Sequence, residues 1–189
     1  ELNTDTVLRT YMTTGKRVVW LDKGEAYFQV KHDSAHPFEV IAGGQRIIDL
    51  GTKFFVRRDF GKLKVGLVEG GIRLAAANAQ KPEATLKHGD EAVIAANHFS
   101  VVKKTAKDLA NELSWRRGFL VFRHATLADV AAEFNRYNRQ KIVIGDAAAA
   151  ETTIDGTFLS NDPGAFTDAA QTVFGLKVRN HGNLIVVSR

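Results

Sequence analysis

The period of the hydrophobic pattern changes once along this chain, close to Ser114. From about residue 17 to residue 102, apolar and polar residues alternate with a period of two, which is typical of strands with one buried face. Beyond residue 115 the apolar residues recur with the 3.6-residue period of amphipathic helices. The change predicts a mainly β part followed by an α+β part, joined by a polar, lysine-rich stretch.

We therefore predict a β-rich module over residues 1–102, a linker over 103–114 and a small α+β domain over 115–189. Glycine-containing turns divide the first module into short strands. One longer strand is predicted to carry five residues on a single face: Ile48, Leu50, Thr52, Phe54 and Val56. Short strands at even spacing fit a sandwich, a barrel or a short stack of β-coils, and the pattern does not choose among them.

The last domain contains two predicted helices with clear end signals. Thr126 and Asp129 have the spacing of a capping box before the first helix. Asp162 is a predicted N-cap with Pro163 in the first turn of the second helix, and Gly175 is its predicted stop. Strand-like segments flank the helices over residues 119–123, 141–144, 157–159 and 176–178, and residues 184–187 are predicted to form one more strand.

The two helices also repeat one another at the level of apolar positions. Leu127 and Val130 of the first helix have apolar equivalents 39 positions later in Phe166 and Ala169. Two strand–helix–strand copies predict a compact domain in which both helices cover one face of a small sheet.

The composition narrows the classes of function. The chain has no cysteine, so thiol catalysis and cysteine-based zinc sites are excluded. No run of about 18 apolar residues is present, and no glycine spacing of a nucleotide-binding loop occurs. With no catalytic constellation at a known spacing, we predict that the chain is not an enzyme and that it needs no cofactor.

The positive charge makes nucleic-acid binding a function to consider. The net charge is +5, and basic residues lie among aromatic ones between Trp115 and Lys141. These aromatic residues occupy strand and helix core positions, so a solvated helix face explains the arginines better than nucleic-acid binding does. His32 and His36 are the close histidine pair, but Pro37 and the neighbouring turn residues favour a loop over a metal site.

Several motifs, in order, resemble those of the FecR-type transmembrane anti-sigma regulators. The first module carries Arg17-x-x-x-Leu21, Gly24-Glu25-Ala26-x-Phe28-x-Val30, Pro37-Phe38-x-Val40 and Leu50-Gly51-Thr52-x-Phe54-x-Val56. The second part carries Trp115-x-x-Gly118-x-Leu120-x-Phe122, followed by a helix. The resemblance extends from about residue 10 to the end of the chain.

The resemblance implies a fold and a location. The first module would be a β-rich FecR module, a short β-coil stack or sandwich. The second would be a small βαβ-repeat domain like those at the N-termini of secretins and signalling TonB-dependent transporters. In the family, a cytoplasmic helical domain and one membrane helix precede this region, so the chain resembles the periplasmic fragment of a single-pass inner-membrane protein.

The resemblance also implies a function in iron-uptake signalling. The region would bind the periplasmic signalling domain of a TonB-dependent outer-membrane transporter and relay ferric-siderophore availability to an extracytoplasmic-function sigma factor. The cytoplasmic domain would contact the sigma factor, and this fragment would contact neither nucleic acid nor membrane. A carbohydrate- or peptidoglycan-facing envelope module is the alternative of a different class.

Two surfaces are predicted to bind the partner. The first is the last strand, whose unpaired edge would accept a strand from the partner: Leu184, Ile185, Val186 and Val187. The second is the flank of the first helix, where positive charge would attract an acidic patch: Arg136, Tyr137 and Arg139. For both surfaces, ordinary packing in a strand or along a helix edge is the simpler explanation.

Overall fold

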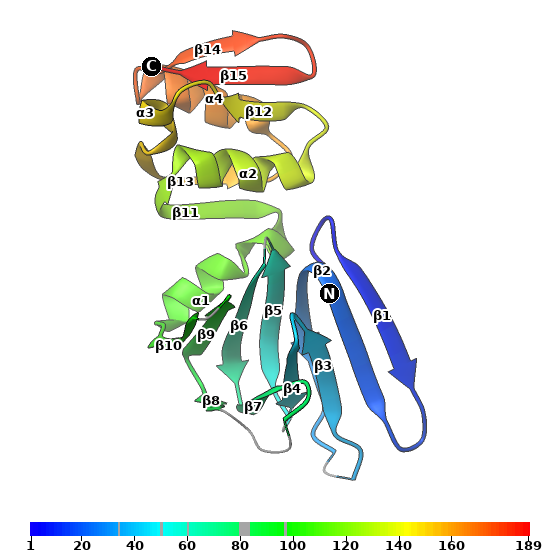
Figure 1. Cartoon of the computed structure of the whole chain (residues 1–189). Coiled ribbons are helices and arrows are strands. Elements are labelled where there is room, and N and C mark those ends of the chain that lie inside the picture. The colour runs from blue at the N-terminus through cyan, green and yellow to red at the C-terminus, as the bar shows by residue number, and fades with distance from the viewer. Residues whose placement is uncertain (34, 50, 60, 80–83, 97) are drawn as a thin grey trace. The chain divides into compact units, whose positions relative to one another are not determined.

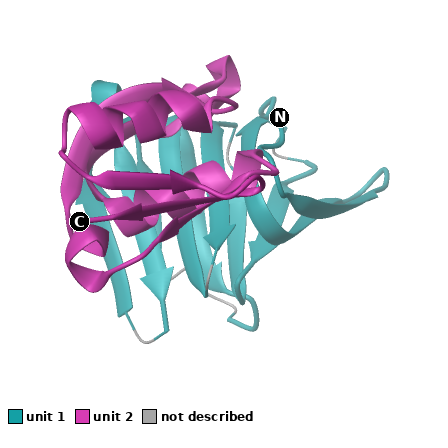
Figure 2. Ribbon diagram, turned by 90° about the horizontal axis from the view of Figure 1, so that it is seen from above, with its two compact units in different colours: residues 1–110 teal, residues 111–189 magenta. Residues whose placement is uncertain are grey.

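The computed structural model describes residues 1–33, 35–49, 51–59, 61–79, 84–96 and 98–189. The chain forms two compact units, residues 1–110 and residues 111–189 (Figure 2). Part of the predicted linker forms helix α1 (Ala106–Glu112), which spans the boundary in the sequence and which Thr105 and Asp108 cap by reciprocal hydrogen bonds. The domain limits at 102 and 115 stay a prediction. Within the described residues, no helix is long and apolar enough to cross a membrane.

The first unit is a curled β-sheet (Figure 1). Its strands are β1 (Val7–Met12), β2 (Arg17–Gln29), β3 (Phe38–Ala42), β4 (Gln45–Asp49), β5 (Lys53–Asp59), β6 (Lys62–Glu69), β7 (Gly71–Ala76), β8 (Ala84–Lys87), β9 (Asp90–Ala95) and β10 (His98–Lys103). Along the sheet the order is β10-β9-β6-β5-β2-β3-β4-β7-β8, and β1 pairs with β2. All these pairs are antiparallel except β2 with β3.

The long strand β2 joins the two halves of this sheet. Its first residues, 17–20, pair with β3, whereas residues 24–29 pair with β5. From there the halves diverge and curl, so that β8 comes close to both β6 and β9. One apolar core fills the space between them, with Leu21 of β2, Phe54 of β5 and Ile72 of β7 among its fully buried members. A mainly β first part is confirmed, and its antiparallel pairing resembles a sandwich more than a coil stack.

The prediction of one strand through residues 48–56 is wrong. Strand β4 ends at Asp49 and β5 begins at Lys53. Between them Gly51 has a φ of +96°, and a Cβ at this position would lie 2.6 Å from the Cβ of His32. A left-handed residue turns the chain, and only glycine fits this one without strain. Leu50, which was predicted to share the strand, lies outside the described residues.

The second unit contains five strands and three helices in the described part of the chain. They are β11 (Phe119–Thr126), α2 (Leu127–Tyr137), β12 (Lys141–Ile144), α3 (Ala147–Ala150), β13 (Thr153–Leu159), α4 (Pro163–Thr172), β14 (Lys177–Asn180) and β15 (Leu184–Ser188), after a 3-10 turn at Ser114–Arg117. Strands β11 and β13 form an antiparallel pair. Strands β12, β15 and β14 form a second sheet, with β12–β15 parallel and β14–β15 antiparallel.

The helix signals are confirmed. Thr126 Oγ1 accepts the Asp129 N–H at 3.1 Å, and Asp162 Oδ1 accepts the Ala165 N–H at 2.9 Å, so both N-caps lie where the sequence placed them. Gly175 has a φ of +64° just beyond α4. The α+β class of the second part is confirmed as well.

The arrangement of the helices differs from the prediction of one sheet with both helices on one face. Helix α2 contacts both β11 and β12, and α4 contacts both β13 and β14. The helices therefore lie between two small sheets (Figure 1). Four phenylalanines join the layers, because the ring of Phe134 is 5.2 Å from Phe166, 5.9 Å from Phe158 and 6.0 Å from Phe122.

Candidate functional site

Strand β15, which contains Leu184–Val187, does not lie at a sheet edge. It is the middle strand of its sheet, with β12 paired on one side and β14 on the other. Its backbone groups are thus used within the sheet, and the predicted strand-accepting edge at Leu184–Val187 is wrong. Ile185 and Val187 point into the core, with exposed fractions of 3% and 0%.

The other residues of β15 lie on the outer face of this sheet. Alternation places Leu184 and Val186 opposite to Ile185 and Val187, and Leu184 is 38% exposed. Val143 of β12 pairs with Val186 across the sheet and is 45% exposed. These three side chains form an apolar centre with no helix packed over it in the described structure, and we call it the outer face.

Two cations border the outer face on the β14 side. Arg179 pairs directly with Val186, and Lys177 pairs with Ser188 two positions further along. Both side chains are exposed, although the Lys177 ammonium also donates to the Arg189 carbonyl at 3.2 Å. Lys141 is turned away, because its ammonium donates to the carbonyls of Asn135 and Asn138 at 2.6 and 2.8 Å. An apolar patch beside Arg179 and Lys177 is suited to an acidic protein surface.

The helix flank is less open than the sequence suggests. Arg136 Nη1 lies 2.9 Å from Glu133 Oε1, and these two side chains are only 10% and 15% exposed. The Arg136 guanidinium also lies 6.0 Å from the centre of the Tyr137 ring. Arg136 and Tyr137 therefore pack along α2, while Arg139 in the following loop is exposed. The local charge of Arg136 is balanced within the helix, so the predicted positive flank consists of Arg139.

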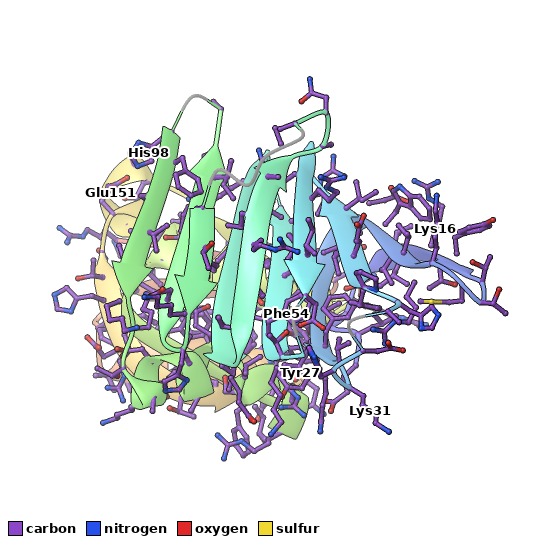
Figure 3. All side chains as sticks on the ribbon, turned by 90° about the horizontal axis from the view of Figure 1, so that it is seen from below. Lys16, Tyr27, Lys31, Phe54, His98 and Glu151 are labelled. Atoms are coloured by element: carbon purple, nitrogen blue, oxygen red, sulfur yellow. The ribbon has the colours of Figure 1, made fainter. Side chains whose placement is uncertain are left out.

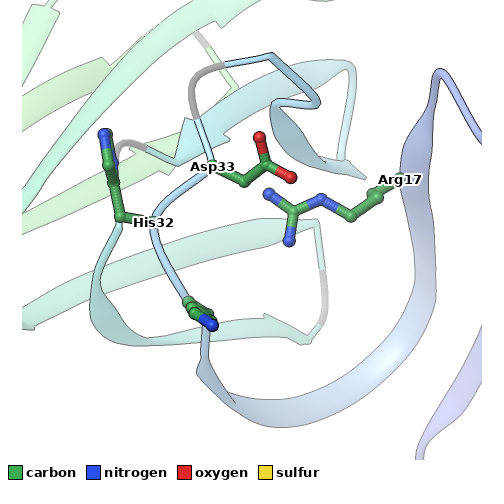
Figure 4. Close-up of a pocket in the computed structure, with 4 residues that line it drawn as sticks. Arg17, His32 and Asp33 are labelled. Carbon is green, nitrogen blue, oxygen red and sulfur yellow. The ribbon is translucent and has the colours of Figure 1, made fainter.

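The histidine pair lies in the loop between β2 and β3, beside an open hollow of about 470 Å³ lined by Arg17, Lys31, His32 and Asp33. His32 and Asp33 point in different directions there (Figure 4). The His36 ring lies 2.9 Å from Asp33 Oδ2, and this contact with the backbone N–H groups of His36 and Ala35 holds the pKa of Asp33 below its usual value. In the described part of the chain, no group of three or more metal-binding side chains comes together.

Comparison with known proteins finds a family match for the first part of the chain. The family model described as FecR protein matches residues 1–73. This segment is a FecR domain. Its residues cover β1 to the first part of β7, including Gly51 and the long strand β2. FecR domains belong to regulatory proteins, which confirms the prediction that this part of the chain is not an enzyme.

The FecR domain and the residues after it resemble two crystal structures of a candidate anti-sigma factor from Parabacteroides distasonis. The first has 24% identity and a TM-score of 0.79, and the match covers 98% of this chain and 87% of that one. The second has 23% identity and a TM-score of 0.79, with 100% and 88% covered. At this identity the likeness establishes the fold. No match is found among curated proteins.

Sequence reasoning missed the outer face because it treated the last strand as an edge. The alternation of Leu184 and Val186 with Ile185 and Val187 was a usable signal, since a strand with one buried face must present the other. The strand order was not readable in the same way. It depends on β12, which lies far earlier in the sequence, pairing with β15 on the side opposite to the β14–β15 hairpin.

Proposed function

We propose that this chain is the periplasmic sensor region of an inner-membrane sigma-factor regulator. The FecR match over residues 1–73 and the fold shared with candidate anti-sigma factors support this function. In the proposal, the chain binds the signalling domain of a TonB-dependent outer-membrane transporter and so relays the state of ferric-siderophore uptake. The contact with the extracytoplasmic-function sigma factor is assigned to a cytoplasmic domain outside residues 1–189.

The observation that carries the docking part of the proposal is the outer face of the second unit. Val143, Leu184 and Val186 place apolar side chains on this face, where Val143 and Leu184 are exposed, and Arg179 adds an exposed charge next to them. Buried apolar contacts would supply most of the affinity, and the cation would orient an acidic partner as it approaches. Arg139 remains as a secondary candidate at the end of α2, whereas Ile185 and Val187 are core residues.

The experiment is a calorimetric titration of the whole chain with the purified signalling domain of the transporter encoded beside it. We expect saturable one-to-one binding, and we expect Val143→Asp to weaken it at least tenfold, because a carboxylate would be buried at the contact. Leu159→Asp is the matched control, since Leu159 lies on β13 of the other sheet and is 47% exposed against 45% for Val143. Equal weakening by both variants would move the contact away from the outer face.

Absence of binding, with both proteins folded, would overturn the sensor function itself. A carbohydrate-binding envelope module is the competing function, and Trp20 is one ring on which a sugar could stack. The Arg9 guanidinium lies 5.6 Å from the centre of that ring while pairing with Asp22 at 2.7 Å, so one face of the ring is occupied. Titration with peptidoglycan fragments tests this alternative directly, and we expect no heat.

A further inference from the structure

Strand β10 ends the sheet of the first unit and has an open edge. It pairs with β9 over all six residues, His98–Lys103, without any shift of register. The sheet order begins with β10, so no described strand lies on its other side, and His98 is seen on this outermost strand in Figure 3. A full-length, regular edge strand presents a row of backbone groups that another strand can bind.

The outward backbone groups can be assigned from one hydrogen bond. Lys104 donates its N–H to the Gly89 carbonyl at 2.7 Å, so Lys104 directs its backbone groups towards the neighbouring β9 hairpin. In an antiparallel pair, successive residues direct their backbone groups alternately inwards and outwards. Phe99, Val101 and Lys103 therefore direct their N–H and C=O groups towards the open edge.

The side chains at this edge are apolar. Phe99 is 46% exposed, Val101 42% and Val102 44%. Phe99 and Val101 stand opposite Ile94 and Ala92 of β9, and Ala92 belongs to the core while Ile94 packs against it. The apolar layer of the core thus continues onto β10, the last described strand on this side of the sheet.

Strand β10 lacks the features that usually prevent an edge strand from pairing with another strand. It contains no proline and no bulge, and its Lys103 ammonium is held by Asp90 of β9 at 3.0 Å. The edge at β1 differs, because it has a register shift beside Val7 and a charged pair between Arg9 and Asp22.

We propose that β10 is a dimerisation edge, which pairs antiparallel with β10 of a second copy of this chain. A two-fold axis at Ser100 places two serines opposite each other and sets Phe99 of each copy against Val101 of the other. Aromatic and β-branched pairs across strands are favourable, and serine suits the closely spaced pair on the axis. The shared apolar layer of the two cores would then run through the junction. A second copy fits because this register matches apolar residues and opposes no like charges among residues 99–101.

The first test is the oligomeric state of the whole chain in solution. We expect sedimentation and light scattering to show a monomer that becomes a dimer as concentration rises. Val101→Pro should abolish the dimer. The backbone N–H of Val101 points to the open edge, so proline removes a donor to the added strand but leaves the hydrogen bonds with β9 intact. Tyr11→Lys on β1 is the control: Tyr11 is 53% exposed, and the dimer should persist. Circular dichroism checks that both variants are folded.

A single cysteine tests the register, because the natural chain has none. Ser100→Cys should form a cross-linked dimer under mild oxidation, since the two residues meet on the axis. Val102→Cys lies on the same face of β10, two positions away, and should not cross-link. A wild type that stays monomeric at all concentrations would overturn the proposal, as would equal cross-linking by both cysteines. A monomer that accepts a strand from another protein would also overturn it, since the occupant would then be a different chain. These outcomes are independent of binding at the outer face.

Discussion

The side chain of Asn135 makes with Ile142 the two hydrogen bonds that a neighbouring strand would make. Its Nδ2 donates to the Ile142 carbonyl at 2.8 Å, and its Oδ1 accepts the Ile142 N–H at 2.7 Å. Asn135 lies on α2 and Ile142 on β12, the edge strand of the sheet that bears the outer face. The helix therefore satisfies this edge at Ile142, where the backbone groups that would attract another strand are occupied.

Replacing Asn135 with alanine should destabilise the second unit by about 1–3 kcal/mol, because both hydrogen bonds are lost at a partly buried position. Urea unfolding measures this as a lower midpoint with an unchanged slope. Asn135→Asp keeps the acceptor but loses the donor, so it should not restore the stability that Asn135→Ala loses. Asn161→Ala, at an exposed turn, serves as the control and should change stability by less than about 0.5 kcal/mol. Wild-type stability in Asn135→Ala would contradict the edge-covering function.

Gly66 is required by the ring of Phe55. The two residues pair across β6 and β5, and a Cβ at position 66 would lie 2.1 Å from Phe55 Cε1. Phe55 is fully buried, so its ring cannot move aside cheaply. Gly66→Ala should cost about 1–3 kcal/mol of stability in thermal or urea unfolding.

The control for this substitution is Gly15→Ala, because nothing lies within 4 Å of a Cβ built there. We expect it to be neutral or slightly stabilising. Adding Phe55→Leu to Gly66→Ala should cost less than the two single effects together, since the smaller side chain removes the clash. Simple additivity would show that the ring does not set the requirement for glycine.

Asp90 should titrate below an ordinary aspartate. Burial acts to raise its pKa, but the Lys87 N–H and the Lys103 ammonium, 2.7 and 3.0 Å away, outweigh burial and lower the pKa. Its contribution to stability is therefore complete above the unfolded pKa of about 3.9 and is lost as pH falls through the lower folded value. Carboxyl-carbon NMR titration measures that value. Lys103→Met should raise it, whereas Lys107→Met should leave it nearly unchanged.

Reversing the charge of Arg179 should slow docking at the proposed outer face. Arg179→Glu is expected to lower the association rate by roughly tenfold at low salt and to make it less sensitive to ionic strength, since the attraction of an acidic partner is lost. Stopped-flow or surface-based kinetics gives both quantities. Arg123→Glu, an exposed arginine on β11, is the matched control. Equal slowing by the two variants would indicate a general effect of net charge.

Local features of this fold were predictable and long-range ones were not. The caps at Thr126 and Asp162 depend on side chains three residues from their partners, and both appear where expected. The turn at Gly51 was missed because Thr52 and Phe54 prolong the alternation of Ile48 through it. The central place of β15 was missed because strand order is decided by pairings about 40 residues apart in sequence, such as Ile142 with Ile185.

In the candidate site, too, local features were predictable and long-range ones were not. The inward and outward residues of β15 follow from alternation, which a sequence carries by itself. The pairing of Arg136 with Glu133 was also within reach, because a spacing of three residues brings side chains together on a helix. The edge cover at Ile142 was not predictable, since it requires the distance between α2 and β12.

The strand order of the first unit determines when it can fold during synthesis. After β6 the chain passes to the other half of the sheet as β7 and β8, and it returns as β9 to pair with β6. Leu86 of β8 and Ala92 of β9 complete the core, so the 73 residues matched by the FecR model lack both. A nascent chain of that length would expose the apolar sides of β2 and β5. The core of this unit can therefore close only once the chain extends through β9, and until then it presents an open apolar sheet.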